Sequence, residues 1–221
     1  MIELKYDCWE KITVNVFEKL NNAITNAEVT GYGDIDLLNK QVAIISVLAD
    51  VDEDRIAELS TNEFSALVKQ TEFLEHTPKK NIINKVTING NEYEVFLSVG
   101  EMNMNQFIDF QTLYKEREKN YKQMLAIFIL PKGKKYCEGY NIQDVIDDIG
   151  EMPITDANNI MFFFVLAFQS LTRVMLNYST KMMRKLMKKE RNKEKTMKIQ
   201  EIINKIQEAQ NLVENGGGFI M

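Results

Sequence analysis

The chain has 221 residues, of which 45% are hydrophobic and 27% charged, and its formal net charge at pH 7 is −5. This length and balance predict a globular protein of one large or two small domains, and ten glycines and three prolines exclude a collagen-like chain. Two cysteines and one histidine exclude a disulfide scaffold and a zinc site made of cysteine and histidine. We expect Cys8 and Cys137 to be free thiols in a reducing cytosol.

Helices are predicted over the first third of the chain. Asp7 is expected to cap a helix through Ile24, with one apolar face made of Trp9, Ile12, Val16, Leu20 and Ile24. A second helix is expected from Asp34 or Asp36 to Leu48, with an inner face made of Leu37, Leu38, Val42, Ile45 and Leu48. Ser60 and Glu63 have the spacing of a capping box and predict a third helix, whose inner face is Phe64, Leu67, Val68, Thr71 and Leu74.

One β-hairpin is predicted in the middle of the chain. Two runs rich in β-forming residues, 85–88 and 92–96, flank Asn89-Gly90, and this dipeptide favours a tight hairpin turn because both residues tolerate positive φ. An isolated hairpin is only marginally stable in water. We therefore expect it to lie against the helices or against a strand of a partner.

Helices are predicted again from Asn103 or Asn105 onward, with stripes at 107–114 and 121–129, a short helix over 142–149, and a long helix capped by Thr155 that passes Lys189. The apolar run within 160–176 is too short for a membrane span and contains polar residues, so it predicts a buried core helix. The predicted fold is mainly α, a multi-helix domain with one small β-hairpin at about 85–97 and a long C-terminal helical arm.

Charge divides the chain. Ten basic and three acidic residues lie between Lys181 and Lys205, a net charge of about +7. Because Glu208 and Glu214 follow, residues 1–180 are left at about −10. We predict a body over 1–176, a basic helical arm over 177–215, and a flexible glycine-rich tail with an apolar tip over 216–221. No membrane span is expected.

The arm and tail carry the predicted partner-binding residues. An apolar seam at helical spacing suits either a partner helix or an intramolecular helical hairpin, and it contains Met183, Leu186, Met187, Ile199, Ile203 and Ile206. Basic side chains are expected to contact phosphate, through nonspecific binding to DNA, or an acidic protein surface: Lys181, Arg184, Lys185, Lys188, Lys189 and Arg191. The three glycines before Phe219, Ile220 and Met221 suggest a tethered peptide that docks in a partner, or else a frayed apolar tail.

No catalytic constellation is found in the sequence. His76 is the one imidazole, and its place at a predicted helix end suits a surface or capping residue. Phosphate-binding and dinucleotide-binding motifs are missing, and the carboxylates between Asp144 and Asp156 lack the spacing of a calcium loop. We predict a protein that is not an enzyme and uses no cofactor or metal. The alternative, an enzyme with an unfamiliar acidic site, predicts a metal-dependent activity that is lost when Asp147 and Asp148 are changed.

Four segments resemble small proteins encoded in the structural gene blocks of crAss-like phages, which infect gut Bacteroidota: Trp9 to Val14, Phe107 to Phe110, Leu130 to Tyr136, and Asp156-Ala157 leading to Phe162–Phe164. The resemblance implies a bacteriophage virion protein, made in the host cytoplasm and placed in the portal, head–tail connector or tail region. It would be a ring or a lumenal cargo protein. The arm and tail lie outside the resemblance, but an acidic body with a basic arm favours contact between copies, so we expect a homo-oligomer that binds other virion proteins through its arm and tail. The alternative is a tail assembly chaperone that binds a client tail protein and is absent from the mature particle.

Overall fold

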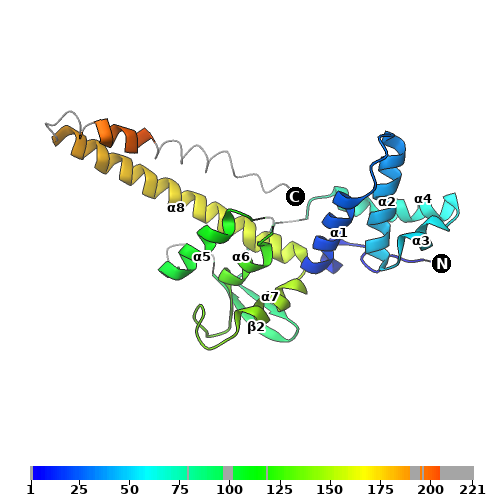
Figure 1. The fold of residues 1–221 in the computed structure, drawn as a ribbon. Helices are drawn as coiled ribbons and strands as arrows, with labels where there is room; N and C mark the ends of the chain where they lie inside the picture. The colour runs from blue at the N-terminus through cyan, green and yellow to red at the C-terminus, as the bar shows by residue number, and fades with distance from the viewer. Residues whose placement is uncertain are drawn as a thin grey trace.

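The fold is an elongated, mainly α-helical body from which one long helix projects (Figure 1). The computed structural model describes residues 2–78, 80–96, 102–117, 119–189, 195 and 197–204. An N-terminal helical unit lies at one end, a small antiparallel sheet with three shorter helices lies in the middle, and the long helix extends to the other end. The predicted fold class is confirmed.

The N-terminal unit contains η1 (Trp9–Lys11), α1 (Val14–Asn26), α2 (Gly33–Ala49), α3 (Glu53–Ala57), α4 (Thr61–Gln70) and η2 (Thr71–Glu75). The expectation of one helix capped by Asp7 is wrong. Ile12 is extended, and α1 is capped by Thr13, whose hydroxyl accepts a hydrogen bond from the amide of Val16. Asp7 instead pairs with Lys11 at 2.8 Å. The capping box of Ser60 and Glu63 is confirmed at the start of α4.

Trp9 joins the two 3-10 segments of this unit. Its indole nitrogen donates hydrogen bonds to the carbonyl oxygens of Phe73 (2.8 Å) and His76 (2.7 Å), and its ring packs against Phe17 and Phe73. His76 ends η2 as its C-terminal cap, in agreement with the predicted role of a capping residue. The single tryptophan of the chain therefore lies at a contact between elements far apart in sequence.

The predicted hairpin is confirmed as β1 (Lys85–Ile88) and β2 (Asn91–Val95), which pair antiparallel with Val86 opposite Tyr93. The turn residues Asn89 and Gly90 both have positive φ, 51° and 82°, as this type of turn requires. A third strand that the sequence did not predict, β3 (Ile129–Pro131), pairs antiparallel with β2, and its first residue was the last of a predicted helical stripe. The hairpin is therefore extended by a strand of its own chain.

Three helices surround this sheet: α5 (Met104–Tyr114), α6 (Tyr121–Phe128) and α7 (Ile142–Gly150). Of the two predicted starts, Asn103 is the cap of α5, because it forms a reciprocal capping box with Gln106. Gln106 is buried, and its amide donates to the carbonyl oxygen of Ile127 at 3.1 Å, which satisfies the polar group and ties α5 to α6. Residues 124–128 of α6 are buried, so this helix is the centre of the core.

Three phenylalanines form the aromatic centre of the core. Phe110 from α5, Phe128 from α6 and Phe164 from α8 (Ile154–Lys189) are each 0% exposed. The ring centroids of Phe128 and Phe164 lie 3.5 Å apart in a stacked arrangement, and Phe110 meets Phe164 edge-on at 4.8 Å. The first part of α8 is thus the buried core helix that the sequence predicts. Within the described residues, no helix combines the length and the apolar character that crossing a membrane would require.

Helix α8 begins at Ile154, one residue before Thr155, which is therefore inside the helix and not its cap as predicted. Its first residues are paired with the N-terminal unit through a two-residue β-bridge between Thr13 and Pro153. The amide of Val14 donates to the carbonyl of Met152 (2.9 Å), and the amide of Ile154 donates to the carbonyl of Ile12 (2.8 Å). This bridge takes Ile12 and Thr13 out of the helix predicted after Asp7, so that α1 begins only at Val14.

The predicted boundary between body and arm, at residues 176 and 177, falls inside α8, which continues unbroken to Lys189. Residues 197–204 are helical again and lie beside the far end of α8 in Figure 1. Ile203 in this returning segment is only 2% exposed. The tail predicted over 216–221 lies outside the described residues.

Candidate functional site

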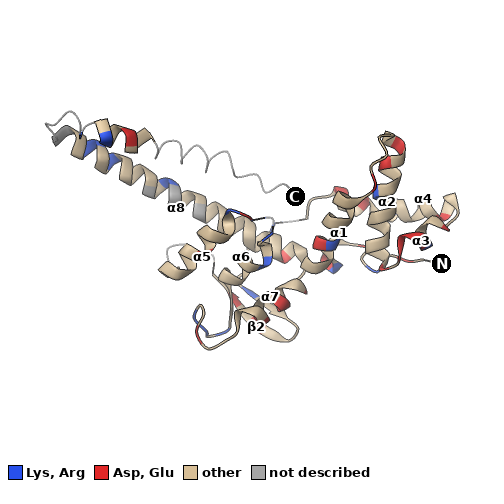
Figure 2. Ribbon diagram, viewed as in Figure 1, with Lys and Arg blue, Asp and Glu red and all other residues tan. Residues whose placement is uncertain are grey.

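The distal part of α8 is the surface on which most predicted partner-binding residues lie. Between Val174 and Lys189 there are five basic residues and no acidic ones. Figure 2 shows these basic positions on the ribbon of the projecting helix, away from the acidic positions of the N-terminal unit. The helix has no glycine or proline over this stretch, so its side chains are held on a rigid support.

One face of distal α8 is turned toward the returning segment. Thr180 is buried and Met183 and Met187 are half-buried, and these three residues share a face at 3.6 residues per turn. Ile199 and Ile203 are the less exposed residues of the segment that folds back. Of the two arrangements that the seam suits, the structure has the intramolecular helical hairpin. Ile203 is therefore already covered within the chain.

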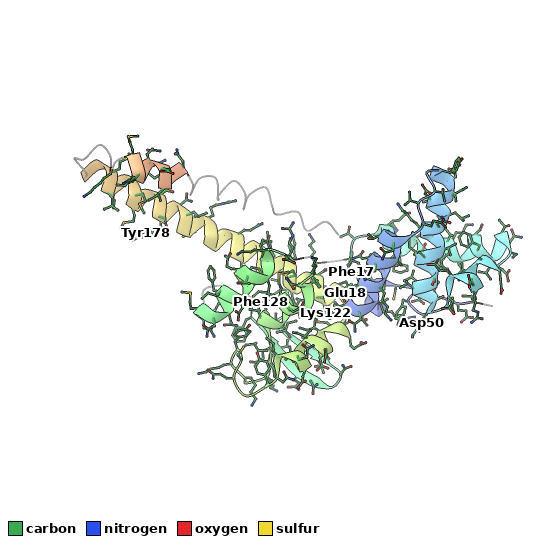
Figure 3. All side chains as sticks on the ribbon, viewed as in Figure 1. Phe17, Glu18, Asp50, Lys122, Phe128 and Tyr178 are labelled. Atoms are coloured by element: carbon green, nitrogen blue, oxygen red, sulfur yellow. The ribbon has the colours of Figure 1, made fainter. Side chains whose placement is uncertain are left out.

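The side of distal α8 that points away from the buried Thr180 is open to solvent. Large apolar side chains stand every four residues along it, and we call this row the outer stripe: Val174, Tyr178, Met182 and Leu186. Val174 and Tyr178 are 61% and 65% exposed. The basic side chains of Lys181, Arg184 and Lys185 flank the stripe, and a shallow depression of about 280 Å³ lies among these residues. Figure 3 shows Tyr178 on the projecting helix, well away from the body.

The predicted partner-binding residues are thus divided between two faces. The less exposed group contains Met183 and Met187 of distal α8 and Ile199 and Ile203 of the returning segment. The exposed group contains Leu186 of the outer stripe and the neighbouring basic residues Lys181, Arg184 and Lys185. Lys188 and Lys189 are the last residues of α8. Arg191, Ile206, Phe219, Ile220 and Met221 lie outside the described residues.

A second exposed apolar surface lies at the α1–α2 connection, and the sequence reasoning missed it. Leu37 and Leu38 were predicted on the inner face of their helix but are exposed, as are Val29, Tyr32 and Ile35. We call residues 28–38 the α1–α2 tip. It contains Glu28, Asp34 and Asp36 and no basic residue, and Lys40 is the first one after it. In the sequence, the signal that indicates this surface is a dense group of apolar residues around Gly31 and Gly33.

The α1–α2 tip is held by specific hydrogen bonds. The carboxylate of Asp36 accepts from the backbone amide of Thr30 (2.6 Å) and from its hydroxyl (2.8 Å). These two bonds, the backbone amide first, hold the pKa of Asp36 below its usual range. The side-chain amide of Asn39 donates to the carbonyl of Glu28 at 3.1 Å, which closes the loop onto α2. The apolar side chains of the tip are therefore presented from an ordered turn.

The acidic residues of α7 were the alternative candidate site, and Asp148 has a clear structural role. Its carboxylate accepts hydrogen bonds from the side chains of Asn89 (2.9 Å), Asn91 (2.8 Å) and Tyr93, which all belong to the hairpin. Burial acts to raise the pKa of Asp148, but the three hydrogen bonds outweigh it and lower that pKa. Asp147 is exposed and accepts a hydrogen bond from the side chain of Gln143 at 2.8 Å. In the part of the chain that the structure describes, no three histidine, cysteine, aspartate or glutamate residues come together as metal ligands.

A polar bridge joins α1, α6 and α7 beside an open depression of about 340 Å³. Lys122 pairs with Glu18 (2.8 Å) and donates to the Asn15 side chain (2.9 Å), and Asn15 donates in turn to Glu151 (2.8 Å). We call these four residues the polar bridge, and Figure 3 shows Glu18 and Lys122 together at this junction. Each member is paired with another, so the arrangement serves to hold three helices in register.

The two cysteines are free in the structure, Cys8 half-buried and Cys137 exposed. The surfaces that stand out are therefore the outer stripe, with its basic flanks, and the α1–α2 tip, with its acidic residues. Both present several large apolar side chains to solvent. No known protein family, curated protein or solved structure matches this chain.

Proposed function

We propose that this protein is a non-enzymatic structural component of a phage particle, which binds other protein chains in the head–tail connector or tail region. The observation that carries the binding role is the outer stripe, an uncovered apolar row on a projecting helix. The phage setting rests on the resemblance of four segments between residues 9 and 164 to proteins of crAss-like structural gene blocks. The protein would be made in the host cytoplasm and become part of the virion.

The energetics of the outer stripe favour a bound state. Covering a half-exposed aliphatic or aromatic side chain gains on the order of 1 kcal/mol, so four of them contribute on the order of 4 kcal/mol. Association itself costs a comparable or larger amount, so the stripe binds stably only where a partner supplies its own apolar and charged groups. The basic flanks of the stripe select a partner surface that carries acidic groups.

A tail assembly chaperone is the second candidate, because the same stripe could hold a client protein and release it later. The two functions differ in what the finished particle contains. A structural component stays in the particle at a fixed copy number, whereas a chaperone leaves before the particle is complete.

The test is quantitative mass spectrometry of purified particles whose genome encodes this chain. We expect the protein at a constant ratio to the portal or tail proteins. Tyr178→Asp on the outer stripe should reduce its incorporation strongly, whereas Ile82→Asp, at an equally exposed apolar position elsewhere, should not. Absence from the particle together with capture on a tail protein before assembly would establish the chaperone and overturn the structural role.

A further inference from the structure

We propose that the outer stripe of one copy docks on the α1–α2 tip of a second copy, so that copies associate head to tail. This inference rests on the proposed assembly function, and it identifies a second copy of the chain as the partner of the outer stripe. Three observations carry it: the apolar character of both surfaces, their opposite charges, and their positions in the molecule.

The two surfaces match in apolar character. The outer stripe presents four large apolar side chains, and the α1–α2 tip presents five, all from 29 to 38. Protein interfaces typically combine apolar contact area with charged groups, and both surfaces contain exposed apolar residues together with charged ones. The tip is fixed by the bonds of Asp36 and Asn39, and the stripe by a continuous helix, so little order is lost on docking.

The two surfaces are opposite in charge. Lys181, Arg184 and Lys185 flank the stripe, and no acidic residue lies between 174 and 189. Glu28, Asp34 and Asp36 lie within the tip, which has no basic residue. Stripe against stripe or tip against tip would bring like charges together, whereas stripe against tip brings opposite charges together. Charge complementarity therefore selects the head-to-tail pair over either symmetric pair.

The positions of the two surfaces make the contact intermolecular. The tip lies at one end of the molecule and the distal part of α8 at the other (Figures 1 and 2). One copy therefore cannot cover its outer stripe with its own α1–α2 tip. Because the two surfaces are different, a row of copies always has one unoccupied outer stripe and one unoccupied tip at its ends. The row stops growing only when these two ends meet and close it into a ring.

The test is a charge-exchange experiment on the full chain, followed by sedimentation velocity at low salt. The stripe variant is Lys181→Glu with Lys185→Glu, and the tip variant is Glu28→Lys with Asp34→Lys. Each alone should weaken self-association by about tenfold or more, because like charges then face each other. An equimolar mixture should associate again, and so should a chain that carries all four changes. Raised salt should weaken the wild-type complex because it screens these charges.

The matched control is Lys134→Glu with Lys135→Glu, which changes the net charge equally at two exposed lysines outside both surfaces. It should associate like the wild type, and circular dichroism should show that all the variants keep their helical content. A wild type that stays monomeric, or variants that fail to restore association when mixed, would overturn the head-to-tail contact. The proposed function is decided separately by the presence of the protein in purified particles, so the two can fail independently.

Discussion

Asp148 is predicted to hold the β-hairpin on α7, and Asp148→Asn removes its charge with almost no change in volume. The hydrogen bond from the buried hydroxyl of Tyr93 to the carboxylate should contribute about 1.5 kcal/mol, since bonds to charged acceptors are the stronger kind. The bonds from Asn89 and Asn91 are exposed and add about 0.5 kcal/mol together. We therefore expect a loss of about 2 kcal/mol, or about 4–8 °C in Tm for a chain of this size.

The lowered pKa of Asp148 also predicts how the stability difference between wild type and variant changes with pH. The pKa of Asp148 is lowered in the folded protein, so its stabilisation is fully present above the unfolded pKa of about 3.9 and is lost as pH falls through the folded pKa. The difference in stability between wild type and variant should be constant from about pH 8 to pH 5 and should shrink on further acidification.

The assay is urea unfolding followed by circular dichroism and by the fluorescence of Trp9, the single tryptophan. Asp147→Asn is the matched control, because Asp147 is exposed and accepts a hydrogen bond from Gln143, so we expect it to cost less than about 0.5 kcal/mol. Equal losses for Asp147→Asn and Asp148→Asn, or a difference that persists undiminished at acid pH, would refute the assigned role.

Three further variants probe the core and the arm. Gly150→Ala would place a methyl group about 2.5 Å from the polar bridge and should cost about 1–2 kcal/mol in urea unfolding despite the better helix propensity of alanine; no loss would contradict the close packing. Phe164→Ala should cost about 3–5 kcal/mol, and Phe163→Ala, at a half-buried position, less than half of that; similar losses would contradict the central place of Phe164. Ile203→Asp should speed amide hydrogen exchange over 197–204 while Met197→Asp, at an exposed position, leaves it unchanged; equal exchange in both would show that Ile203 does not hold the returning segment.

Local signals predicted much of the fold. The capping boxes at Ser60 and Asn103 and the Asn89-Gly90 turn each depend on neighbouring residues alone, so a short stretch of sequence is sufficient to identify them. The strand at Ile129–Pro131 was not predicted, because three apolar residues after an apolar helix have no period of their own. Its strand character comes from pairing with β2, which lies far away in sequence.

The start of α1 was also not predictable from local sequence, because it depends on a partner far away in the chain. The residues from Trp9 to Ile24 have a continuous helical period, but the bridge between Thr13 and Pro153 extends the chain at Ile12. A pairing over such a separation leaves no mark on the hydrophobic period of either segment.

The candidate surfaces were predicted in part. Helical spacing identified the seam of distal α8, but periodicity says which residues share a face and not what covers that face. Met183 is half-buried whereas Leu186 is exposed, a division that depends on tertiary structure. Leu37 and Leu38 were expected inside for the same reason: their period is helical, but no described element packs over the first turns of α2.

The bridge between Thr13 and Pro153 has a consequence for the order in which the protein is made. About 140 residues separate its two halves, so a ribosome that adds about 5–20 residues per second exposes the first half on the order of 10 s before the second is synthesised. During that interval Ile12 and Val14, which are 0% exposed in the finished fold, have no α8 to pair with. Synthesis of the start of α8 therefore sets the earliest moment at which the N-terminal unit is locked onto the rest of the chain.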